Sequence, residues 1–144
     1  MLGRSSVLDL VVWFFVRTVL GLFLASVLGA VGFFAGWMLW SPSTSASLAS
    51  MFRVCGAGIG ASIGGFVGWL RPEDTLVLKA ATLGLALLGG MAGAWGGLTY
   101  GSEVYEKGVF ARGTQISTIL GGAIVCNIVP GLFNMYWARH HGRF

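Results

Sequence analysis

Four long apolar segments, separated by short polar links, constrain the fold of this chain more than any other feature. They cover about 18–40, 51–70, 76–100 and 114–136, and each is long enough to cross a hydrocarbon core of about 30 Å as a helix. Of the 144 residues, 56% are hydrophobic and 10% are charged, whereas soluble domains are about 25% charged. We therefore predict an all-α membrane protein, with four transmembrane helices in a single polytopic domain, 1–144.

The first apolar segment is longer than one span requires, because it begins near Val7 and continues to Trp40. Arg17 interrupts it, and we expect this residue to mark the entry into the membrane. Residues 5–17 then lie at the interface or extend the helix. The apolar run also continues far beyond the hydrophobic region of a cleaved signal peptide, which predicts an uncleaved first span.

Basic residues are distributed unequally between the two predicted sides of the membrane. One side carries Arg4, Arg17, Arg71, Lys79, Arg139 and Arg143, and the other carries Arg53, Lys107 and Arg112. Lysine and arginine are enriched on the cytoplasmic side, so we predict that both termini face the cytoplasm or its organellar equivalent. The membrane is then a bacterial cytoplasmic membrane or an organellar inner membrane. Trp13 and Trp69 fall at the inner ends of spans, where indole rings favour the headgroup level.

The stretch "CGAGIGASIGGFVGWL", residues 55–70, repeats glycine at every fourth position: Gly56, Gly60, Gly64 and Gly68. A phosphate-binding loop requires a turn between a strand and a helix, usually with a lysine, whereas this stretch lies inside a span. In a helix, positions i and i+4 share one face, and small residues let helices in lipid approach closely. We therefore predict that Gly60 and Gly64 lie at a helix–helix contact.

Similar rows of small residues occur in the other three spans, as a glycine zipper would require. They include Gly21 and Gly29 in the first span, Gly89, Gly93 and Gly97 in the third, and Gly121 and Gly122 in the fourth. The rows give a weak internal similarity, to which the glycine-rich composition contributes. They either pack the four helices against one another or leave a face for a partner or a second copy.

The run "WLRPEDTLVLKAATLGLALLGG" joins a basic–proline–acidic link to a helix rich in small residues. Together with four glycine-rich spans in a short chain, it resembles the mitochondrial Tim family, in which a similar link joins the second and third spans. The polar link at 101–113 departs from the pattern of that family. No residue role or function is carried over from the resemblance.

The middles of the spans contain no Asp, Glu, Lys or His. Pumps and ion-coupled carriers usually place such residues inside the membrane, so their absence argues against both classes. The two histidines, His140 and His141, are adjacent in the C-terminal tail without a cysteine or carboxylate beside them, which is too few ligands for a metal site. No serine has an evident base partner. We therefore predict no enzyme activity and no cofactor. Bound lipid is left open, and so is a pigment held through water or a carbonyl group instead of a histidine.

Three amide side chains lie in the fourth span: Gln115, Asn127 and Asn134. They lie near Pro130, which removes one backbone hydrogen bond and frees the carbonyl of Cys126. The amides either line a polar pathway or form hydrogen bonds with neighbouring helices, typically worth about 0.6 kcal/mol each.

These observations favour a small non-catalytic integral-membrane subunit that packs into a larger complex, for which respiratory and photosynthetic assemblies are plausible hosts. Its partners would be the lipid bilayer and other integral-membrane subunits, and a homo-oligomer is also possible. The alternative is a homo-oligomeric channel or small-solute carrier, with a pore built from the three amides and glycine carbonyls. The net charge is +4, but the basic residues form no cluster outside the C-terminal tail. We therefore predict no nucleic-acid partner.

Overall fold

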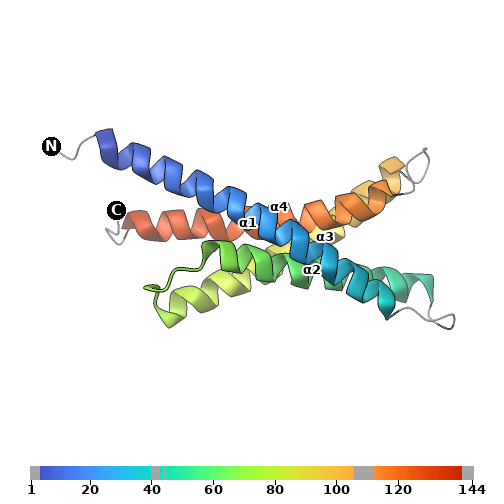
Figure 1. Cartoon of the computed structure of the whole chain (residues 1–144). Helices are drawn as coiled ribbons and strands as arrows, with labels where there is room; N and C mark the ends of the chain where they lie inside the picture. The colour runs from blue at the N-terminus through green and yellow to red at the C-terminus, as the bar shows by residue number, and fades with distance from the viewer. Residues whose placement is uncertain (1–3, 40–42, 44, 106–111, 141–144) are drawn as a thin grey trace.

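The computed structural model describes residues 4–39, 43, 45–105 and 112–140. They form four α-helices, which are α1 (Arg4–Met38), α2 (Ala46–Trp69), α3 (Leu76–Tyr105) and α4 (Gly113–His140) (Figure 1). All four are long and apolar enough to cross a membrane, and the predicted all-α class with four spans is confirmed. Predictions that concern Trp40, Lys107, His141 and Arg143 lie outside the described residues.

Local sequence signals explain where the helices begin and end. Ser45 caps α2, because its side chain accepts a hydrogen bond from the backbone nitrogen of Leu48 at 3.4 Å. The same helix ends at Trp69 because Pro72 disfavours helical geometry in the residue before it. In contrast, nothing interrupts α1, so residues 5–17 extend the helix of the first span. Its 35 residues cover about 52 Å, well beyond the hydrocarbon core.

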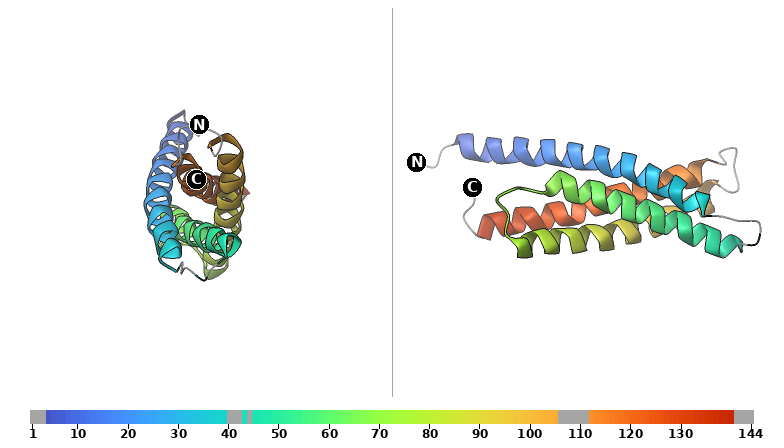
Figure 2. Two further views of the ribbon diagram at one scale, coloured as in Figure 1. Left: turned by 90° about the vertical axis from the view of Figure 1, so that its right-hand side faces the viewer. Right: turned by 60° about the horizontal axis from the view of Figure 1, so that its bottom comes forward.

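Both described chain ends lie at the same end of the bundle (Figures 1 and 2). The start of α1, the end of α4 and the link at 70–75 form what we call the terminal end. The end of α1, the start of α2, the end of α3 and the start of α4 are at the opposite, distal end. This arrangement agrees with the predicted grouping for those basic residues that the structure describes, and the assignment of the terminal end to the cytoplasm stays a prediction.

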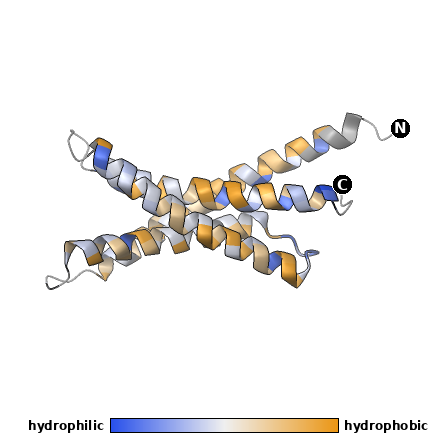
Figure 3. Cartoon of the chain, turned by 180° about the vertical axis from the view of Figure 1, so that it is seen from behind, coloured by the Kyte–Doolittle hydropathy of each residue, from blue (hydrophilic) through white to orange (hydrophobic). Residues whose placement is uncertain are grey.

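The four helices form two hairpins that cross each other (Figure 1). α1 packs along α2, and α3 packs along α4, while α2 contacts both α3 and α4 and α1 contacts α4. Among the described residues, no Cα atom of α1 lies within 8 Å of a Cα atom of α3. α2 and α4 therefore form the centre of the bundle. Most of the strongly hydrophilic positions lie toward the helix ends (Figure 3).

The contacts within the first hairpin recur in the second. A Cβ atom added to Gly32 would overlap the carbonyl oxygen of Gly56, and a Cβ added to Gly56 would overlap the carbonyl oxygen of Gly32. The same reciprocal relation joins Gly93 of α3 to Gly121 of α4. At these two pairs the backbones of antiparallel helices meet without room for a side chain.

The contacts on either side of these pairs also correspond. A Cβ on Gly36 would overlap the carbonyl oxygen of Phe52, and a Cβ on Gly97 would overlap that of Ser117. In the other direction, Gly60 faces the carbonyl of Leu28, and Gly89 faces that of Val125. The weak similarity between the small-residue rows thus corresponds to a repeated contact register between helices.

Candidate functional site

The glycine row of α2 faces α1 along the length of the first hairpin. Besides Gly56 and Gly60, an added Cβ on Gly64 would overlap the backbone of Ala25, and one on Gly68 would overlap Gly21. Gly29 is less confined, because the nearest atom to its added Cβ is the Cβ of Ala61 at 3.4 Å. The structure therefore brings together the predicted small residues of the first and second spans.

In the second hairpin, the predicted residues Gly89, Gly93, Gly97 and Gly121 lie between α3 and α4. Gly122 lies at the centre of the bundle, where an added Cβ would be 3.4 Å from the carbonyl oxygen of Gly90 in α3 and 3.5 Å from the Cβ of Ala61 in α2. Each predicted small residue of the third and fourth spans is therefore close to a neighbouring helix.

Two further glycines, Gly84 and Gly96, differ from these. Apart from its chain neighbours and the nearby backbone of α3 itself, an added Cβ at either one would meet no heavy atom within 4 Å. Gly96 is exposed, although it is adjacent to Gly97, whose added Cβ would overlap α4. Glycine content alone therefore does not identify the contact face of α3.

Asn127 joins three helices through its side chain. Its Nδ2 donates a hydrogen bond to the carbonyl oxygen of Thr18 in α1 at 2.7 Å. Its Oδ1 accepts one from Nε1 of Trp69 in α2 at 2.6 Å. Asn127 is 2% exposed, and such a buried amide is stable in an apolar interior when its polar atoms are bonded.

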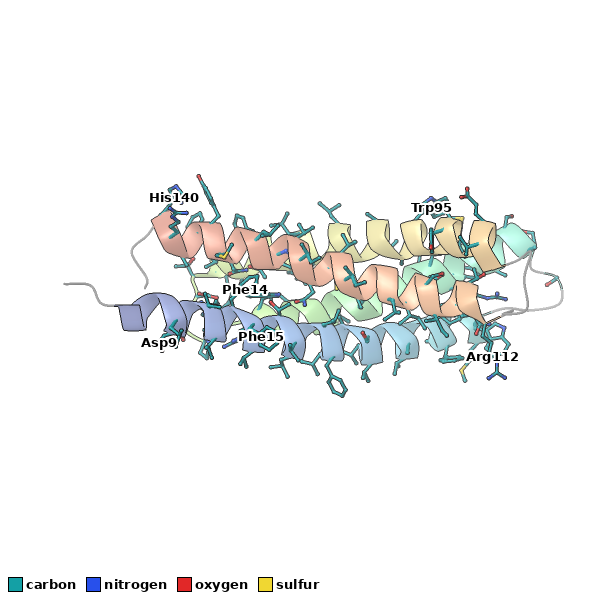
Figure 4. All side chains as sticks on the ribbon, turned by 90° about the horizontal axis from the view of Figure 1, so that it is seen from above. Asp9, Phe14, Phe15, Trp95, Arg112 and His140 are labelled. Atoms are coloured by element: carbon teal, nitrogen blue, oxygen red, sulfur yellow. The ribbon has the colours of Figure 1, made fainter. Side chains whose placement is uncertain are left out.

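Trp69 lies at the end of α2, where the sequence placed it, but its ring is buried within the bundle and is only 1% exposed. Its ring packs on Gly131, where an added Cβ would be 2.6 Å from Cζ2. Its centroid is 5.5 Å from that of Phe14 and 5.9 Å from that of Trp13. Figure 4 shows Phe14 on the inner side of α1. The continuous α1 covers the indole, and Asn127 supplies the acceptor for its N–H, so the ring is buried without leaving the N–H unpaired.

Arg17 binds the end of α2. Its Nη1 donates to the carbonyl oxygens of Gly68 at 3.0 Å and Leu70 at 2.9 Å. The last carbonyls of a helix have no partner within the helix and carry partial negative charge, so a guanidinium group is a favourable cap there. The guanidinium of Arg71 lies 3.8 Å from the ring centroid of Trp13, a cation–π contact.

Two other buried polar side chains also connect helices. Oγ of Ser62 in α2 donates to the carbonyl oxygens of Gly58 at 2.5 Å and of Ala86 in α3 at 2.9 Å. Nδ2 of Asn134 in α4 lies 3.1 Å from Oγ1 of Thr82 in α3 and 2.9 Å from the carbonyl oxygen of Pro130. The sequence analysis singled out Asn134 but not Ser62, although serine is one of the small residues enriched where membrane helices meet.

Of the three predicted amides, Gln115 is separate from the others. It is exposed near the distal start of α4, whereas Asn127 and Asn134 are buried and bonded to other helices. The structure therefore does not gather the three amides around one pathway.

Groups that could perform chemistry are dispersed. Within the described residues, no three His, Cys, Asp or Glu side chains come together as a metal site would require. Cys55 and Cys126 are free thiols, and Sγ of Cys126 is 3.1 Å from the carbonyl oxygen of Ala61. The ring of His140 lies 4.0 Å from that of Tyr136.

Two apolar grooves open on the outside of the bundle, in its distal half. The α1–α2 groove has a volume of about 550 Å³ and includes Gly32, Gly56, Ile59 and Ile63 in its lining. The α3–α4 groove has a volume of about 600 Å³, and its lining includes Gly121 and Arg112. The two grooves occupy corresponding positions in the two hairpins.

The fold and these contacts define a polytopic α-helical membrane protein with four spans. Comparisons of the chain with protein-family models, curated proteins and solved structures give no match. The Tim-like link therefore stays a resemblance.

Proposed function

We propose that this protein is a small non-catalytic subunit that packs into and stabilises a larger membrane protein complex. The proposal is carried by the observation that its buried polar side chains form hydrogen bonds between helices. Ser62, Asn127 and Asn134 each bond to a neighbouring helix. Side chains engaged in this way hold the bundle together and do not offer free polar groups to a solute.

The alternative, a homo-oligomeric channel or small-solute carrier, requires polar groups that face a water-filled path. Asn127 is enclosed between α1, α2 and α4, and Gln115 lies apart from it near the distal end. Neither groove has Asn127 or Asn134 in its lining. These positions favour a packing role over conduction.

Arg53 adds a reason to expect a partner. It lies about 10 Å along α2 from the start of that helix, and its Nε is buried without a hydrogen bond to any described residue. A charged group in an apolar environment is costly unless it is paired. A carboxylate or a carbonyl group on a neighbouring subunit would supply the missing acceptor.

The test is purification of the protein from its native membranes in a mild detergent, followed by mass spectrometry of the whole assembly. We expect one or more other integral-membrane proteins at fixed stoichiometry. Arg53→Gln should lower their recovery several-fold while the melting temperature of the isolated bundle stays unchanged. Arg139→Gln, which alters an exposed arginine at the terminal end, is the matched control.

Recovery of a homo-oligomer without other proteins, together with solute or ion flux after reconstitution into liposomes, would support the channel or carrier instead. Recovery of a monomer alone would contradict both functions. Partner recovery that is insensitive to Arg53→Gln would keep the subunit function but remove Arg53 from the interface.

A further inference from the structure

The α3–α4 groove has an apolar floor and one charged end. Gly97 and Gly121 contribute its floor, and the exposed side chains of Ile116 and Leu120 contribute its wall. Arg112 lies where α4 begins, at the distal end of the groove. Figure 4 shows the Arg112 side chain directed away from the helices.

The length of this groove matches one leaflet of a bilayer. From Arg112 to Ile124, the lining residues cover about 18 Å along α4. Half of a hydrocarbon core is about 15 Å thick. A groove that extends from the headgroup level to the bilayer centre fits one acyl chain of one leaflet, whereas a transmembrane helix of a partner would need a contact surface through both leaflets.

The charge at the end of the groove favours an anionic headgroup. Arg112 is exposed, and no hydrogen bond or ion pair joins its side chain to a described residue. The N-terminus of α4 adds the positive end of a helix dipole beside it. A guanidinium group binds phosphate oxygens through parallel hydrogen bonds.

We propose that the α3–α4 groove binds one anionic phospholipid from the distal leaflet. One acyl chain lies along the glycine floor and the phosphate is bound by Arg112. The α1–α2 groove provides an internal comparison, because it has a similar volume but no charged side chain among the described residues of its lining. This proposal does not depend on the function proposed above, since a subunit, a channel or a carrier would each present the groove to lipid.

The test is lipid titration of the purified full chain in detergent, followed by native mass spectrometry. Phosphatidylglycerol and phosphatidylcholine with identical acyl chains are the two probes. We expect phosphatidylglycerol to bind at least tenfold more tightly, and Arg112→Gln to remove that preference. Ile124→Trp should fill the groove and weaken both lipids at least fivefold. The matched substitution Leu132→Trp, at an exposed residue of the same helix outside the groove, should leave both affinities unchanged.

Equal binding of the two lipids by the unaltered protein would overturn the proposal, as would a preference that survives Arg112→Gln. This variant changes only an exposed side chain, so it keeps the test valid even if Ile124→Trp disturbs folding. Cysteine cross-linking supplies a further check: a Leu120→Cys variant that cross-links to a second copy or to another protein in native membranes would show that protein, not lipid, occupies the groove.

Discussion

The indole nitrogen of Trp69 lies 2.6 Å from the side-chain oxygen of Asn127, and this hydrogen bond joins the last residue of α2 to α4. The amide nitrogen of the same asparagine donates to Thr18 in α1. One side chain therefore connects both hairpins at the level where α2 ends. Arg17, the residue before Thr18, binds the carbonyl groups at the end of α2, so the two contacts define one connection between α1, α2 and α4.

Substitution of Asn127 by leucine should destabilise the bundle. The change keeps the number and branching of the side-chain heavy atoms but removes both hydrogen bonds and leaves the buried indole N–H of Trp69 without an acceptor. Hydrogen bonds between membrane helices contribute about 0.6 kcal/mol each, and at most about 1.7. We expect the free energy of unfolding in bicelles to fall by about 1–3 kcal/mol.

The control for this prediction is Gln115→Leu, which removes an exposed amide at the distal end of the same helix and should cause little change. A double-mutant cycle with Trp69→Phe isolates the pair, since the second change removes the donor. Additive effects of Asn127→Leu and Trp69→Phe would show that the hydrogen bond contributes nothing measurable.

Arg17 should protect the last turn of α2 from fraying. Arg17→Gln removes the charge that binds the carbonyls of Gly68 and Leu70, so the backbone amide of Leu70, which is bonded to Phe66 at 2.9 Å, should exchange hydrogen faster. Arg17→Lys retains the charge without the planar guanidinium and should give an intermediate rate. Hydrogen exchange with mass spectrometry measures both, with Arg139→Gln as the control. Unchanged exchange at the end of α2 in Arg17→Gln would exclude the capping role.

The two ends of the bundle should lie on opposite sides of the membrane, with the terminal end in the cytoplasm. Single cysteines at Ser45, Glu73 and Glu103, all at exposed positions, can be introduced into a Cys55→Ser, Cys126→Ser background. We expect an impermeant thiol reagent to label Glu73→Cys from the cytoplasmic side, and Ser45→Cys and Glu103→Cys from the other. Labelling of Glu73→Cys and Glu103→Cys from one side would contradict the topology.

Hydropathy and the charged links were enough to predict four helices, because backbone groups in lipid leave few other structures for apolar segments of this length. The spacing of Gly56, Gly60, Gly64 and Gly68 also predicted one face of α2. The partner of that face was not predictable, since a row of small residues carries no information about which of three other helices it meets. The pairing of α1 with α2 and of α3 with α4 emerged only from the structure.

The burial of Trp69 was not predictable from the sequence. A tryptophan at the end of a span usually lies at the headgroup level, and nothing in the local sequence indicates that α1 continues past this end and covers the ring. The acceptor, Asn127, is distant in the sequence and comes from another hairpin. Gly96 and Gly97 also look alike in the sequence, but Gly96 faces open space and Gly97 faces α4. The difference comes from contacts with a helix that is distant in the sequence.

The approach of the helix backbones at the glycine pairs is tested most directly by alanine substitution, with the free energy of unfolding measured in bicelles. Gly56→Ala and Gly121→Ala place a methyl group on the carbonyl oxygen of Gly32 or Gly93, and overpacking typically costs about 1–3 kcal/mol. Gly84→Ala and Gly96→Ala place the same group in open space, where alanine favours the helix by up to about 1 kcal/mol. We predict lower stability for the first two variants, and unchanged or higher stability for the other two. Equal effects in all four variants would contradict the conclusion that the hairpins are held by close backbone contact at these glycines.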